Sequence, residues 1–182
     1  IWLGPLIGLI LTLPSLFMGY VADDHLYHQN VIEHSVYKQR PIWDYFNFVS
    51  SDTEVIHYRE KGILPWWTPE TFRSRTFRPV ASLIHTVLFR YLYDFPWVGH
   101  SGLILLYVLL IFVCTRLFDR FSSSFVGIGL AILLFTINDT HAYSVGWLSS
   151  YNTMLSCFFG ILSLFMHDQW RRYKSRSALF LF

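Results

Sequence analysis

Two adjacent carboxylates, Asp23 and Asp24, directly follow a segment, residues 1–22, that carries no charge. A carboxylate beside an apolar segment is costly unless it is paired or used. Such a group could act as a general base on a hydroxyl or hold a divalent cation. The alternative is structural, with the pair ending one helix and capping the next. Spacing alone leaves both interpretations open.

Three arginines, Arg73, Arg75 and Arg78, stand just before an apolar stretch that begins at Pro79. Guanidinium groups hold phosphate through paired hydrogen bonds, and the N-terminus of a following helix would assist them. The alternative is an anchor in which the arginines face lipid headgroups. The pattern is compatible with both.

Histidines form a third group. His25 and His28 are three residues apart, so a helix would place them on one face, as a zinc site requires. No cysteine or glutamate completes a recognisable zinc pattern, so we expect hydrogen-bonded or solvated histidines and no metal site.

A short polar turn, residues 138–141, ends in His141 and precedes Trp147 and a mostly apolar run containing Asn152. A polar residue inside such a run either bonds to a neighbouring helix or lines a cavity, and helix packing is the interpretation we favour for Asn152.

The composition tells which solvent these residues meet. Of 182 residues, 53% are hydrophobic and only 14% are charged, against about a quarter in soluble domains. Lipid as solvent accounts for that balance. The net charge of +2 is too small to indicate nucleic acid. Cys114 and Cys157 both lie in apolar runs and are interpreted as small hydrophobic residues.

Apolar segments predict an all-α membrane protein with several transmembrane helices and a helical extracytoplasmic loop after the first span. About 20 apolar residues cross a bilayer as a helix. The expected spans are 1–22, 101–118, 121–138 and 147–166, and a fifth begins at 177–182. We treat 1–182 as one membrane domain and expect it to be the N-terminal fragment of a longer protein, since it starts without methionine and stops inside an apolar run.

The interval 23–99 forms the predicted loop. A helix is expected from Asp24 to Gln39, and Ser51-x-x-Glu54 followed by Gly62 predicts the start and end of another. Residues 66–69 resemble an aromatic anchor at a membrane interface. The uncharged, mostly apolar run of 11 residues from Pro79 to Phe89 is too short to span, so it predicts an interfacial or re-entrant helix with Pro79 in its first turn.

Basic residues orient the spans. The turns after the second and fourth spans contain or adjoin six of them: Arg116, Arg120, Arg171, Arg172, Lys174 and Arg176. The turn between the third and fourth spans has no Lys or Arg. By the positive-inside rule those two turns are cytoplasmic, so the 23–99 loop and the 138–147 turn share the outer face.

Taken together, these segments resemble the N-terminal part of the GT-C type polytopic glycosyltransferases, in particular bacterial relatives of the transmembrane and tetratricopeptide-repeat O-mannosyltransferases. The family has an acidic pair after the first helix, an Arg-Pro segment opening a helix in the outer loop, a His at the second span and a Trp-containing turn before the fourth. The matching segments here are Asp23-Asp24, Phe77-Arg78-Pro79-Val80, His100 and Val145-Gly146-Trp147-Leu148. Leu103 and Tyr143 stand where the family pattern has Asn and Glu, and no Asp-x-Asp is present.

The resemblance implies a membrane enzyme of the bacterial inner membrane that uses a polyprenyl-phosphate sugar donor and a protein or glycan acceptor, with a divalent cation left open. It implies an acidic residue of the first loop as base, Asp23 first and Asp24 next. Arg78 is the candidate for the donor phosphate, and Arg75, His100 and His141 complete the predicted substrate-binding set. Two other classes stay open, a non-catalytic scaffold or sensor on a related fold and a transporter of a lipid-linked substrate.

Overall fold

A computed structural model describes residues 2–29, 31 and 40–173, and these residues are mostly helical. The chain divides into two compact units. Unit 1 contains residues 1–24 and 94–182, and unit 2 contains residues 25–93. The predicted fifth span and most of the 30–39 part of the predicted loop helix lie outside the described residues.

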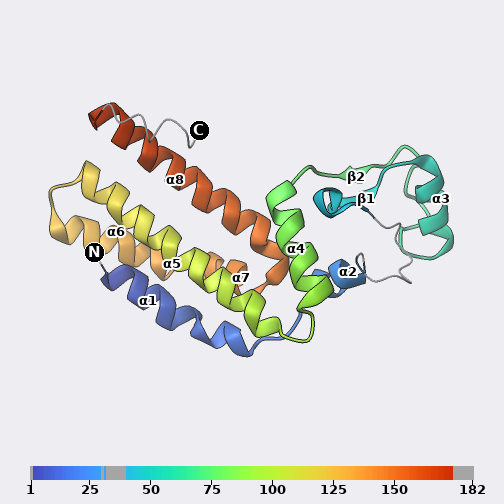
Figure 1. Cartoon of the computed structure of the whole chain (residues 1–182), viewed down its shortest axis with the longest axis horizontal. Helices are drawn as coiled ribbons and strands as arrows, with labels where there is room; N and C mark the ends of the chain where they lie inside the picture. The colour runs from blue at the N-terminus through green and yellow to red at the C-terminus, as the bar shows by residue number, and fades with distance from the viewer. Residues whose placement is uncertain (1, 30, 32–39, 174–182) are drawn as a thin grey trace. The chain divides into compact units, whose positions relative to one another are not determined.

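Unit 1 is a bundle of helices that run side by side (Figure 1). Its elements, in chain order, are α1 (Leu3–Thr12), the 3-10 helix η1 (Leu13–Phe17), α5 (Pro96–Phe121), α6 (Phe125–Thr136), α7 (Asp139–Gly146), the 3-10 helix η3 (Leu148–Ser150) and α8 (Tyr151–Tyr173). The helix α2 (Asp23–Gln29) starts at the last residues of the unit's first segment.

Glycines let α1 approach its neighbours closely. A Cβ on Gly4 would lie 2.3 Å from Cγ2 of Ile132 in α6, and one on Gly8 would lie 2.3 Å from Cδ1 of Ile111 in α5. Gly4 and Gly8 are four residues apart and so face the same way, the small-residue spacing that brings helices together in membranes. The Trp2 ring stacks on Phe112 at 5.1 Å, which places the start of α1 beside the later part of α5.

Two helices of unit 1, Pro96–Phe121 and Leu148–Arg172, are long and apolar enough to cross a membrane. A third span is present if α6 and α7, which meet at a bend of 46°, are counted as one. The first apolar stretch is helical over Leu3–Phe17, which is shorter than the predicted 1–22. The α-helix changes to a 3-10 helix at Leu13, next to Pro14. The part of the sequence-based prediction that holds is therefore a helical protein with membrane-length helices.

The two ends of the bundle differ in chemistry. At one end the guanidinium of Arg120 lies 5.9 Å from the ring of Phe165, and Arg172 donates to the carbonyl of Arg120 at 3.5 Å. At the other end the hydroxyl of Tyr151 donates to the carbonyl of Gly99 at 2.7 Å. Helices α5 and α8 consequently run in the same direction, with the arginines gathered at their C-terminal ends.

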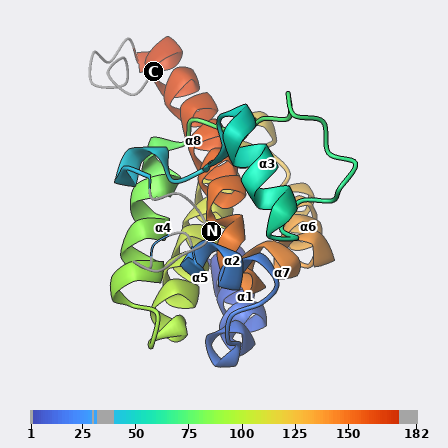
Figure 2. The same cartoon turned by 90° about the vertical axis from the view of Figure 1, so that its right-hand side faces the viewer.

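Unit 2 combines short helices with a two-stranded antiparallel sheet, which the all-α prediction did not include. Its elements are the rest of α2, the 3-10 helix η2 (Ile42–Asp44), β1 (Asn47–Val49), α3 (Asp52–Glu60), β2 (Ser74–Arg75) and α4 (Pro79–Tyr91). The strands lie between α4 and α3 in Figure 1, and Figure 2 shows the two helices on separate sides of unit 2.

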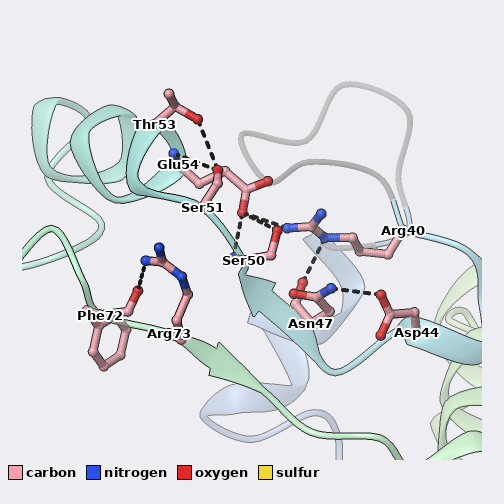
Figure 3. A network of polar contacts seen from close by, with 9 residues as sticks. All are labelled: Arg40, Asp44, Asn47, Ser50, Ser51, Thr53, Glu54, Phe72 and Arg73. Atoms are coloured by element: carbon pink, nitrogen blue, oxygen red, sulfur yellow. Dashed lines mark hydrogen bonds and ion pairs between the residues drawn. The ribbon is translucent and has the colours of Figure 1, made fainter.

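A polar network fixes the start of α3 (Figure 3). The Ser51 hydroxyl accepts from the Glu54 amide at 3.3 Å, so the predicted N-cap is confirmed. The Glu54 carboxylate accepts from Arg40 at 2.7 Å and from the Ser50 amide at 2.8 Å. Burial opposes ionisation, but these bonds and the charge of Arg40 outweigh it and hold the pKa of Glu54 below its usual value. Gly62, at φ 71°, ends the helix as predicted.

An aromatic cluster surrounds His85 of α4. The imidazole is fully buried and lies 5.1–5.7 Å, between ring centroids, from four rings: Tyr27, Tyr45, Phe46 and Phe89. Burial, with a smaller contribution from the positive charge of Arg78, lowers the pKa of His85 to about 3. The ring is neutral at physiological pH and serves unit 2 as a core residue.

Candidate functional site

The carboxylate of Asp24 accepts three hydrogen bonds within unit 1. It is completely buried, and one oxygen accepts from the Ser149 amide at 2.8 Å and from the Ser149 hydroxyl at 2.5 Å. The second oxygen accepts from the amide of Val21 at 3.0 Å. The side chain thus joins the start of α2 to η3, 125 residues further along the chain.

A tight turn before α2 aims this carboxylate. Ala22 has a φ of 48°, in the left-handed region that non-glycine residues seldom occupy, and the Asp24 amide donates to the carbonyl of Val21 at 3.0 Å. The indole of Trp147 donates to the same Val21 carbonyl at 3.2 Å. Residues 147–149 therefore hold the turn from two directions.

Close helix approaches surround the turn. A Cβ on Gly99 would lie 2.8 Å from Leu148, and one on Gly102 would lie 2.1 Å from the hydroxyl of Tyr151. A Cβ on Gly146 would lie 3.3 Å from the sulfur of Met18. Three segments far apart in sequence, near residues 18–24, 99–102 and 146–151, consequently meet at one end of unit 1.

The neighbouring carboxylate, Asp23, is held quite differently. The Asp23 side chain is half-buried, and its carboxylate makes no hydrogen bond or ion pair among the described residues. Both carboxylate oxygens of Asp24, in contrast, accept hydrogen bonds. Asp23 sits in the first turn of α2, where the helix dipole favours a negative charge. Its backbone is fixed by the same turn that Asp24 closes, so a partly accessible carboxylate is presented on a rigid base.

His100 also belongs to this end of unit 1. Its ring is completely buried, with Nε2 3.5 Å from the carbonyl oxygen of Gly19 and with no partner for Nδ1 in the described part of the chain. His141 lies elsewhere in the unit, with its ring 4.5 Å from Phe135 and 5.3 Å from Tyr107. Asn138 caps α7 by accepting from the Thr140 amide at 3.0 Å, which gives the polar turn a structural role.

The two predicted arginines are in unit 2. Arg75 is exposed in β2, opposite Asn47 of β1. Arg78 is exposed just before α4, with its guanidinium 5.2 Å from the ring centroid of Phe46. The expected contact of Arg78 with the donor phosphate stays a prediction.

His25 and His28, which have the spacing of a zinc site, both contact other residues of unit 2. Nδ1 of His28 donates to the carbonyl of Phe89 at 2.8 Å, and its ring stacks on Tyr93 at 3.5 Å. Nδ1 of His25 lies 3.3 Å from the hydroxyl of Tyr93. Within the described ranges, no group of three or more His, Cys, Asp or Glu side chains is placed to hold a metal ion.

Sequence reasoning missed Ser149 and Val21 as partners of the acidic pair. Val21 is three residues before Asp24, the spacing at which a first-turn carboxylate reaches back to a backbone amide, so this bond could have been predicted. Ser149 lies 125 residues from Asp24, and its only sequence signal was the predicted position of the Trp147 segment on the same face as the loop.

Comparison with known proteins finds no matching family model, no matching curated protein and no matching solved structure.

Proposed function

We propose that this chain is part of a membrane glycosyltransferase that moves a sugar from a polyprenyl-phosphate donor to an acceptor hydroxyl on the extracytoplasmic face. The single observation that carries the proposal is the unequal use of the acidic pair. Both carboxylate oxygens of Asp24 accept hydrogen bonds from Ser149 and Val21. Asp23 next to it is partly accessible and has no polar partner among the described residues.

In this proposal Asp23 accepts the proton of the acceptor hydroxyl as its oxygen attacks the sugar carbon. The bond from that carbon to the donor phosphate breaks, and the polyprenyl phosphate leaves. Asp24 is a positioning residue that fixes the backbone of Asp23. A partly buried carboxylate at the end of a bundle with membrane-length helices suits a donor that is itself dissolved in the membrane.

Arg78 is proposed to contact the donor phosphate. It is exposed, and it directly precedes Pro79 at the N-terminus of α4, where helix amides add to the attraction for an anion. His100 has a buried ring nitrogen without a partner among the described residues, which suits a polar contact formed only with substrate.

The full burial of Asp24 also favours a second candidate, a non-catalytic scaffold or sensor. A carboxylate that ties α2 to η3 would be needed for folding even if no reaction took place.

Transfer by the full-length protein in membranes, from a polyprenyl-phosphate sugar, separates the two. Asp23→Asn keeps the shape and removes the base, so turnover should fall on the order of 10²–10⁴-fold with little change in KM. Arg78→Ala should raise KM for the donor. Asp139→Asn, which removes an exposed first-turn carboxylate of α7, is the matched control and should transfer at the wild-type rate.

Wild-type turnover by Asp23→Asn at equal expression would reject Asp23 as the base. Absence of transfer by wild type from every lipid-linked sugar offered would favour the scaffold.

A further inference from the structure

The helix α4 in unit 2 exposes an apolar face. Val80, Leu83, Val87 and Tyr91 are 40–68% exposed. Their spacing of three, four and four residues places them along one face of the helix. Phe77, just before the helix, is 78% exposed as well. We call the set Val80, Leu83, Val87 and Tyr91 the apolar stripe.

The buried face of α4 is mixed, and half of its residues are polar: Ala81, Leu88 and Phe89 lie there with Ser82, His85 and Thr86. His85 lies within the aromatic cluster described above. A helix that met water on its outer side would expose the three polar residues and bury the stripe. The apolar stripe therefore suits an apolar environment outside unit 2.

Length and charge identify that surrounding. The helix has 13 residues, so it is about 20 Å long at 1.5 Å per residue. This is too short to cross a hydrocarbon core of about 30 Å. Arg78 and Arg90, both exposed, stand at its two ends. The 23 residues from 71 to 93 include four arginines and no carboxylate.

We propose that α4 lies along the membrane interface, with the apolar stripe in the acyl region and Arg78 and Arg90 bound to phosphates of anionic phospholipids. An apolar face flanked by cationic side chains at both ends is the arrangement of helices that lie in an interface plane. A guanidinium pairs well with phosphate, and the rings beside the two arginines, Phe46 and Tyr91, support them. At Arg78 a phospholipid phosphate would compete with the phosphate of the proposed sugar donor, but the placement of α4 does not depend on the proposed sugar transfer.

The test uses the full chain in vesicles of phosphatidylcholine with phosphatidylglycerol. Cys114 and Cys157 are replaced by serine, and a single cysteine at Leu83 or Val87 carries an environment-sensitive fluorophore. We expect strong quenching by lipids with a nitroxide on the acyl chain and weak quenching by aqueous iodide. Ile56, an exposed aliphatic residue of α3, is the matched control and should show the opposite order.

The arginines are tested in the same samples. With Arg78→Gln and Arg90→Gln together, the preference of position 87 for nitroxide-labelled phosphatidylglycerol over labelled phosphatidylcholine should fall toward one. Iodide quenching at 83 and 87 equal to that at 56 overturns the proposal. Protection from both quenchers also overturns it, because the stripe would then be covered by protein, either another part of the full chain or a second copy. An unchanged lipid preference in the double variant removes the arginines from the proposal.

Discussion

The carboxylate of Asp24 and the amide of Ser149 are 125 residues apart in the chain and 2.8 Å apart in space. The contact closes one end of unit 1 and leaves Asp23, one residue earlier, partly accessible. Residues that are adjacent and chemically identical in the sequence thereby have different environments in the structure.

The first prediction concerns the stability of this contact. Both Asp24 oxygens accept from donors, so Asp24→Asn must turn its NH2 group toward an N–H or leave a donor unpaired. Each buried unpaired group costs about 1–3 kcal/mol. Ser149→Ala removes only the hydroxyl bond and should cost about 1 kcal/mol. Thermal unfolding in detergent should rank wild type above Ser149→Ala and Ser149→Ala above Asp24→Asn.

Asp23→Asn is the control for that series and should unfold close to wild type, since no partner of Asp23 is found among the described residues. An Asp24→Asn midpoint equal to that of Asp23→Asn would contradict the assigned role. An aspartate that only caps a helix can be replaced by asparagine at little cost. The hydrogen bonds of Asp24 predict a loss of stability instead.

A second prediction tests the close approach of α1. Gly4→Ala and Gly8→Ala each place a methyl 2.3 Å from a buried isoleucine, Ile132 or Ile111. Overpacking of this kind costs about 1–3 kcal/mol, with the larger cost at Gly4, because Cγ2 of Ile132 cannot swing away as the end of a side chain can. Unfolding midpoints should drop for both variants. Gly129→Ala, whose Cβ would meet nothing within 4 Å, should show no loss.

The third prediction is the orientation of the chain. The arginine end of the bundle should face the cytoplasm and residues 25–93 the opposite side. In a background without Cys114 and Cys157, an impermeant maleimide added from outside should label a cysteine at Glu60 and not one at Arg171, two exposed positions. The reverse pattern would invert the topology and remove the extracytoplasmic assignment of the proposed transfer.

A fourth prediction follows from the buried imidazole of His85. The pKa of His85 is about 3 in the folded chain, against an ordinary value of 6.5 for histidine. Between these two pH values the imidazole is protonated in the unfolded chain and neutral in the folded chain. Stability is therefore lost as pH falls from about 6.5 toward 3, on the order of 1 kcal/mol per pH unit. Unfolding midpoints measured from pH 7 to pH 5 should show this slope.

His85→Phe keeps an aromatic ring in the cluster and has no proton to bind, so its unfolding midpoint should change less over the same interval. The interval lies above the range in which Glu54 titrates, because the pKa of Glu54 is below its usual 4.5. An equal slope in the variant would place the acid sensitivity in another group.

Local features of the fold could be predicted from sequence, because neighbours along the chain decide them. Ser51 caps α3 and Pro79 opens α4, as expected from rules that involve three or four consecutive residues. Helices of membrane length were found at α5 and α8 because apolar composition over about 20 residues is itself the signal. The two-stranded pairing of Asn47 with Arg75 was missed, because strands of two and three residues leave no periodic pattern.

By itself the sequence determined a helical chain with membrane-length apolar segments, an acidic pair after the first of them and an arginine-rich entry to α4. Only the tertiary structure decided that Asp24 is buried on Ser149 while Asp23 is not, and that α4 exposes Leu83 and buries His85. The physical reason is the same in both cases. Burial and hydrogen bonding depend on which distant segments come together. The type of a side chain does not show which segments these are.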